Sequence, residues 1–169
     1  ALAADMNEHN RVLVIDTQLS ALCQNILDIY ARFQFEKSVF EHVEKGFLNA
    51  SQLCELMKKA LLKSFGDGLD PNYLHPYRWI TKVHYYIPDI AYYNFPYTFG
   101  ALFSRGLYAK YKEEGSSFIP KYEALLQATT TNTVEDVAAI AGIDLTTDKF
   151  WKQSLQSIVD QMKEFLSLA

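Results

Sequence analysis

The chain has 169 residues, of which 49% are hydrophobic and 21% are charged, and its formal net charge is −4. These values are typical of one folded globular domain and exclude a disordered or fibrous chain. The 16 basic residues are dispersed among 20 acidic ones, which excludes a basic face for nucleic acid. No apolar run approaches the roughly 18 to 20 residues that cross a bilayer, so the sequence predicts no membrane association.

The two cysteines, Cys23 and Cys54, lie far apart and form no CxxC pair. This spacing favours neither a zinc site nor a disulfide framework. We expect both to be reduced thiols in the apolar core, which is typical of a cytoplasmic protein.

Apolar residues recur at alternating steps of three and four from Leu19 to Phe47, which predicts one long helix. Asp16 or Thr17 is expected to cap its start, and Gly46 to end it. Glu36 interrupts the apolar stripe. Its preferred interpretation is a solvated residue on a slightly rotated face, and the alternative is a buried functional carboxylate.

The rest of the chain also predicts helices. Asn49 and Gln52 form a capping-box pair before a helix that Gly66 ends. Residues 66–71 then form a turn-rich joint within a single helical region, 1–169. Further helices are expected over residues 73–86, 96–114, 133–141 and 148 onward. No strand is predicted, so the expected fold class is all-α, with six to eight helices.

Tyrosine is concentrated in one part of the chain, because nine of the eleven tyrosines lie between residues 73 and 111. Several follow His84 closely. A neutral phenol donates a hydrogen bond at neutral pH, and a neighbouring histidine can donate as well or move a proton. Such donors suit a reaction in which a carbonyl oxygen gains negative charge, such as peptide hydrolysis. The alternative is that these rings only fill a core.

Motifs for metal or covalent catalysis are missing from the chain. It contains no HExxH, GxSxG, phosphate-binding glycine loop or GxGxxG. The four histidines, His9, His42, His75 and His84, have no helical i, i+4 spacing, so no metal ligand is predicted in this chain.

The segment His84 to Gly100, HYYIPDIAYYNFPYTFG, continuing as ALFSRGLYA, resembles the C-terminal segment of oligoendopeptidase F. That protein is one of the thimet-oligopeptidase-like zinc metallopeptidases. IYARFQFEKSVFE, residues 29–41, and the AGIDLTTDKFW string within residues 134–155 resemble neighbouring segments of the family. The resemblance covers about residue 19 to the end of the chain.

This resemblance implies a helical, zincin-like peptidase that hydrolyses short peptides in a deep channel. An HExxH helix and a later glutamate would hold zinc there, and the glutamate within HExxH would activate the zinc-bound water. His84 matches the family histidine that holds the substrate carbonyl or the oxyanion, and Tyr93 matches a family tyrosine with that role. Tyr97 lies one residue beyond a further catalytic tyrosine. Tyr92, Asn94 and Tyr86 are predicted to bind substrate.

The zinc helix of the family is missing, and the chain begins at Ala1. Asn7–Glu8 resembles the Asn–Glu pair that follows the third zinc ligand, but the ligand position would fall on Ala1, and Glu8 is not assigned as a ligand. We therefore expect a C-terminal part of a peptidase, inactive alone, whose partners are short peptides and the remaining N-terminal part, which binds the zinc. The alternative is a stand-alone helical module that binds peptides without cleaving them.

Overall fold

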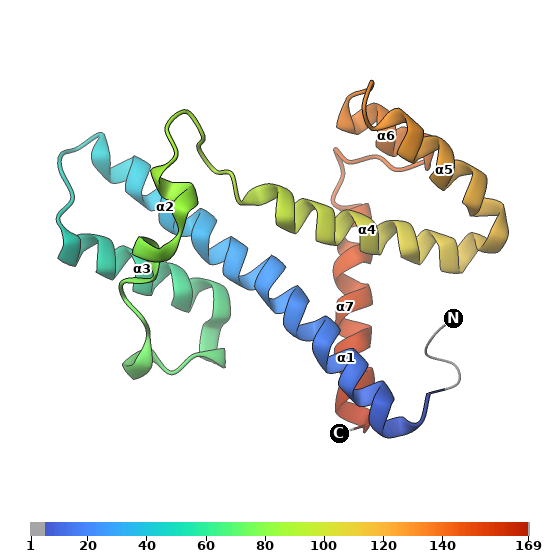
Figure 1. Cartoon of the computed structure of the whole chain (residues 1–169), viewed down its shortest axis with the longest axis horizontal. Coiled ribbons are helices and arrows are strands. Elements are labelled where there is room, and N and C mark those ends of the chain that lie inside the picture. The colour runs from blue at the N-terminus through green and yellow to red at the C-terminus, as the bar shows by residue number, and fades with distance from the viewer. Residues whose placement is uncertain (1–5, 169) are drawn as a thin grey trace. The chain divides into compact units, whose positions relative to one another are not determined.

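The computed structural model describes residues 6–168, and over these residues every regular element is helical (Figure 1). The predicted all-α fold class is confirmed, whereas the predicted count of six to eight helices is not. The chain forms two compact units. We call residues 20–99 the tyrosine unit, and residues 6–19 with 100–168 the C-terminal unit.

The first helix is longer than its apolar stripe predicts. Helix α1 (Glu8–Cys23) runs through one π-helical turn (Gln24–Asp28) into α2 (Ile29–Val43). The predicted caps Asp16 and Thr17 are wrong, because both lie inside α1. Instead, the Asn7 side chain accepts a hydrogen bond from the Asn10 backbone N–H at 2.9 Å, which is N-cap geometry.

The continuous helix Glu8–Val43 is 36 residues long and is apolar enough, by length and composition, to cross a membrane. Core helices of soluble proteins pass the same test, so this is weak evidence for a membrane span. The cytoplasmic location and the lack of membrane association remain predictions.

In the tyrosine unit, α2 packs beside α3 (Ala50–Phe65) (Figure 1). The predicted capping box at the start of α3 is confirmed, because Asn49 and Gln52 exchange hydrogen bonds of 2.9 and 3.0 Å. Gly66 ends α3 with a φ of 57°, a conformation that favours glycine. The two helices enclose the core of this unit, which is formed by Ala31, Phe35, Met57, Ala60 and Leu61.

The predicted helix over residues 73–86 is wrong. The segment instead forms short 3₁₀ turns at Pro71–Tyr73, Arg78–Thr81 and Val83–Tyr86, and a further one, Gly66–Gly68, directly follows α3. Pro76 explains the difference, because its ring and missing N–H disfavour a helix interior. Lys82 adds an extended residue, with φ −102° and ψ 94°, between the last two turns. The predicted joint, 66–71, falls within this unit.

Helix α4 (Phe95–Glu114) begins in the tyrosine unit and continues into the C-terminal unit. It ends at Gly115, which has a φ of 67°. Helix α5 (Ile119–Ala128) was not predicted, although Pro120 in its first turn is a sequence signal for a helix start. Thr133 caps α6 (Val134–Ile140) as predicted, and α7 (Lys149–Leu168) completes the unit. The core of this unit includes Leu107, Phe118, Leu125, Ala138 and Phe150.

One cysteine differs from its prediction. Cys54 is buried in the core, as expected, but Cys23 is exposed. Cys23 directly precedes the π-helical turn, and its neighbour Leu22 takes the buried position, with 8% of its surface exposed. The prediction that Cys23 is a core thiol is therefore wrong.

At Gly106 the backbone of α4 lies close against the side chains of α7. A Cβ atom at this position would lie 2.2 Å from Phe150 Cε2 and 2.6 Å from Ser154 Oγ, and both partners are buried. Since the core there cannot accept a methyl group, we expect Gly106→Ala to lower the free energy of unfolding of the C-terminal unit by about 1–3 kcal/mol. Trp151 fluorescence during urea unfolding, in a Trp79→Phe background, measures the change.

Gly100→Ala is the matched control on the same helix. A Cβ atom at Gly100 meets no atom within 4 Å. Alanine has the higher helix propensity, so this variant should gain up to about 1 kcal/mol. Equal stability changes in the two variants would contradict a steric role for Gly106.

Candidate functional site

Three of the predicted catalytic residues lie in one aromatic row. The His84 ring stacks on the Tyr93 ring with centroids 5.0 Å apart and an interplanar angle of 13°. Tyr97 meets Tyr93 edge to face, with centroids 6.3 Å apart. Tyr93 and Tyr97 remain 42% and 46% exposed. The structure thus brings together a 3₁₀ turn, the following loop and the first turn of α4, and leaves both tyrosines accessible to a ligand.

Tyr92, the residue directly before Tyr93, fixes the conformation of this loop. Tyr92 has a φ of 56°, a left-handed conformation that is uncommon outside glycine. Its backbone N–H donates to Glu36 Oε1 at 2.7 Å. Its ring packs against Phe33 and Phe40, with centroid distances of 5.3 and 5.5 Å. Tyr92 therefore anchors the loop to α2, and its predicted contact with substrate stays a prediction.

Glu36 is buried, with 8% of its surface exposed, so its interpretation as a solvated residue is wrong. Burial raises the pKa of the Glu36 carboxyl, because the charged form loses hydration. The hydrogen bond from Tyr92 and the charge of His84 act on this pKa in the opposite direction. Glu36 is therefore a buried acceptor for the backbone of the residue that precedes Tyr93.

A buried ionic network holds the same segment on α2. Asp28, which is 3% exposed, pairs with Arg32 at 2.5 Å and also with Arg78. The other arm of Arg32 donates to the side-chain oxygen of Asn94 at 3.1 Å, and Asn94 is 2% exposed. Tyr85 donates its hydroxyl to the Arg32 carbonyl at 3.3 Å, and burial raises the pKa of this phenol. The network ties α2 to both ends of the segment that carries His84.

Sequence reasoning missed Asp28, Arg32 and Arg78. The i, i+4 spacing of Asp28 and Arg32 is the signal that indicates this pair. Nothing local points to Arg78.

Two predicted substrate-binding residues have different surroundings. Asn94 is enclosed and bound to Arg32, whereas Tyr86 is 54% exposed and its hydroxyl lies 3.5 Å from the Trp79 carbonyl. The His84 Nδ1 atom is buried and has no hydrogen-bond partner among the described residues. The substrate contacts predicted for Asn94 and Tyr86 stay predictions.

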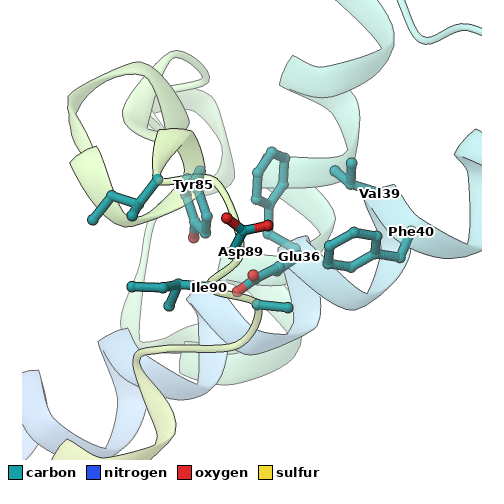
Figure 2. Close-up of a pocket in the computed structure, with 9 residues that line it drawn as sticks. Glu36, Val39, Phe40, Tyr85, Asp89 and Ile90 are labelled. Carbon is teal, nitrogen blue, oxygen red and sulfur yellow. The ribbon is translucent and has the colours of Figure 1, made fainter.

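A cavity of about 470 Å³ opens beside Glu36 (Figure 2). Helix α2 contributes Glu36, Val39 and Phe40, and the facing segment contributes Tyr85, Asp89 and Ile90. Apart from the two carboxylates and the Tyr85 hydroxyl, the side chains that line this cavity are apolar, and none is basic. Asp89, like Tyr92, has a positive φ, of 64°.

The described residues do not fit a zinc ion. Among residues 6–168, no group of three or more histidine, cysteine, aspartate or glutamate side chains is arranged to hold a metal. The aromatic row can donate hydrogen bonds to a carbonyl or an oxyanion, which is the chemistry of substrate polarisation. Comparison of the chain with protein-family models, with curated proteins and with solved structures gives no match.

Proposed function

We propose that the chain is the C-terminal part of a cytoplasmic, zincin-like metalloendopeptidase of the oligoendopeptidase F kind, which hydrolyses short peptides. The observation that supports this function is the row His84–Tyr93–Tyr97, in which both tyrosines are accessible. The sequence resemblance matches His84 and Tyr93 to groups that bind the substrate carbonyl or the oxyanion, and Tyr97 lies one residue beyond a further catalytic tyrosine of the family. In this proposal His84 and the two phenols donate to the substrate carbonyl and stabilise the negative charge that it gains.

Tyr86, Tyr92 and Asn94 are proposed to shape the substrate channel around that row. Tyr86 is exposed and contacts the peptide directly. Tyr92 and Asn94 shape the channel indirectly. The Tyr92 ring packs on α2, and the Asn94 side chain accepts a hydrogen bond from Arg32. In this proposal the N-terminal part of the enzyme would hold the zinc ion, which would activate a water molecule for the reaction.

A peptide-binding module without catalysis is the second candidate. It is favoured by the large side chains that segment 73–97 exposes. Six of them are more than half exposed, namely Tyr73, Tyr77, Ile80, Val83, Tyr86 and Phe95. Such a surface suits either a peptide or the remaining part of a peptidase.

Peptide hydrolysis by two proteins tests the proposal. The product of the complete gene should cleave an internally quenched oligopeptide and lose this activity with EDTA, whereas the 169-residue chain should not cleave it. Intact mass and zinc content identify the complete product. An upstream sequence without HExxH would favour the binding module. So would a complete gene product that has no peptidase activity, together with peptide binding by the chain that EDTA does not alter.

A further inference from the structure

The cavity beside Glu36 is lined by acidic and apolar side chains, and it shares no lining residue with the aromatic row His84–Tyr93–Tyr97. It pairs two carboxylates with walls of aliphatic and aromatic side chains, and its volume of about 470 Å³ lies in the range of small-ligand pockets. Glu36, which is 8% exposed, supplies one carboxylate, whose Oε1 accepts a hydrogen bond from the Tyr92 backbone N–H. Asp89 supplies a second carboxylate from the facing loop.

The charges around the cavity are unbalanced. Arg32, four residues before Glu36, and Arg78 both pair with Asp28. Among the described residues, His84 is the charged group that acts to lower the pKa of the Glu36 carboxyl. A partly buried carboxylate without a strong cation is costly, and a ligand cation would offset that cost.

We propose that this cavity binds a primary ammonium group attached to an apolar side chain, with Glu36 and Asp89 accepting the ammonium hydrogens and Val39, Phe40 and Ile90 contacting the apolar part. A neutral ligand would leave the carboxylates uncompensated, and an anionic ligand would be repelled by them. Within the proposed peptidase, the ligand of this class is the free N-terminus of an oligopeptide with an apolar first residue, an extension that rests on the proposed function.

The test titrates the full 169-residue chain with 2-phenylethylammonium chloride and follows backbone amide resonances by NMR. The amides of Ile90, Ala91 and Tyr92 should shift, because they belong to or adjoin the cavity lining. 2-Phenylethanol should bind at least about tenfold more weakly, which corresponds to about 1.4 kcal/mol, and 3-phenylpropionate should not shift these amides. Equal affinities for the amine and the alcohol would overturn the proposal.

Two variants assign the carboxylates. Glu36→Gln keeps an acceptor for the Tyr92 N–H and removes the charge, and Asp89→Asn keeps a residue type that tolerates a positive φ. Each should weaken amine binding about tenfold. Glu44→Gln, on the exposed end of α2, is the control and should leave the affinity unchanged. Unchanged amine affinity in both Asp89→Asn and a folded Glu36→Gln variant would refute the assignment. If Glu36→Gln does not fold, unchanged affinity in Asp89→Asn alone would refute it.

A pair of peptides separates this inference from the proposed function. Phe-Ala-Ala-Ala with a free N-terminus should shift the same amides, and its N-acetylated form should not. If the amine binds and neither peptide does, the cavity is an ammonium site and the extension to peptide N-termini is wrong. If neither the amine nor the free peptide binds, the ammonium site itself is wrong, whatever the peptidase assay gives.

Discussion

Replacing Tyr93 by phenylalanine in the full-length form of the proposed peptidase is expected to lower kcat by about 10²- to 10³-fold while changing KM little. Phenylalanine keeps the ring that stacks on His84 at 5.0 Å and removes only the hydroxyl. A donor aimed at the oxyanion acts in the transition state rather than in the bound substrate, so its loss appears in kcat. Steady-state hydrolysis of a quenched peptide measures both constants.

His84→Ala should lower kcat by a similar factor, and Tyr73→Phe should not. Tyr73 is the matched control because it lies in the same segment and is 86% exposed. Urea unfolding of each variant checks the alternative. If Tyr93→Phe lost stability and activity in parallel, the tyrosine would serve packing, and the catalytic assignment would be wrong.

Asp28→Ala is expected to destabilise the tyrosine unit by about 3–5 kcal/mol, since it leaves buried guanidinium charge without its partner. Asp28 is 3% exposed and pairs with both Arg32 and Arg78, so one substitution removes two ion pairs. The measurement is urea unfolding followed by Trp79 fluorescence, in a Trp151→Phe background. Asp28→Asn should also be destabilising, because an amide keeps the shape but not the charge.

Glu41→Ala is the control for the effect of losing an ion pair on the same helix. Glu41 and Lys37 lie 3.8 Å apart, with side chains 59% and 52% exposed. Exposed pairs contribute about 0–1 kcal/mol, so this variant should unfold nearly as the wild type does. A loss of stability in Asp28→Ala no larger than that in Glu41→Ala would show that the buried network is not needed for folding.

Local signals explain which parts of the fold could be predicted. The capping box at Asn49, the cap at Thr133 and the positive-φ glycines at 66 and 115 depend only on neighbouring residues, and the structure confirms them. The predicted helix over residues 73–86 is wrong because Pro76 disfavours a helix interior, and short 3₁₀ turns form there instead. The burial of Glu36 depends on Tyr92, which lies 56 residues away along the chain, and no periodicity reveals such a partner.

The candidate site, too, could be predicted only in part, because some of its contacts join residues that are far apart along the chain. The resemblance selected His84, Tyr93 and Tyr97, and the structure places their rings in contact, while their catalytic role remains a proposal. Spacing indicates only the Asp28–Arg32 pair of the ionic network, because Arg78 lies 50 residues from Asp28 along the chain. Ion pairs of this kind depend on the tertiary fold, which a pattern of apolar residues does not specify.

The hydrogen bond between Tyr92 and Glu36 connects the cavity with the aromatic row. Glu36 lines the cavity, and the amide that it holds belongs to the residue immediately before Tyr93. A ligand bound to this carboxylate would act directly on the peptide unit next to Tyr93. We therefore expect binding in the cavity and binding at the aromatic row to be coupled, in which case each would change the affinity of the other by the same factor.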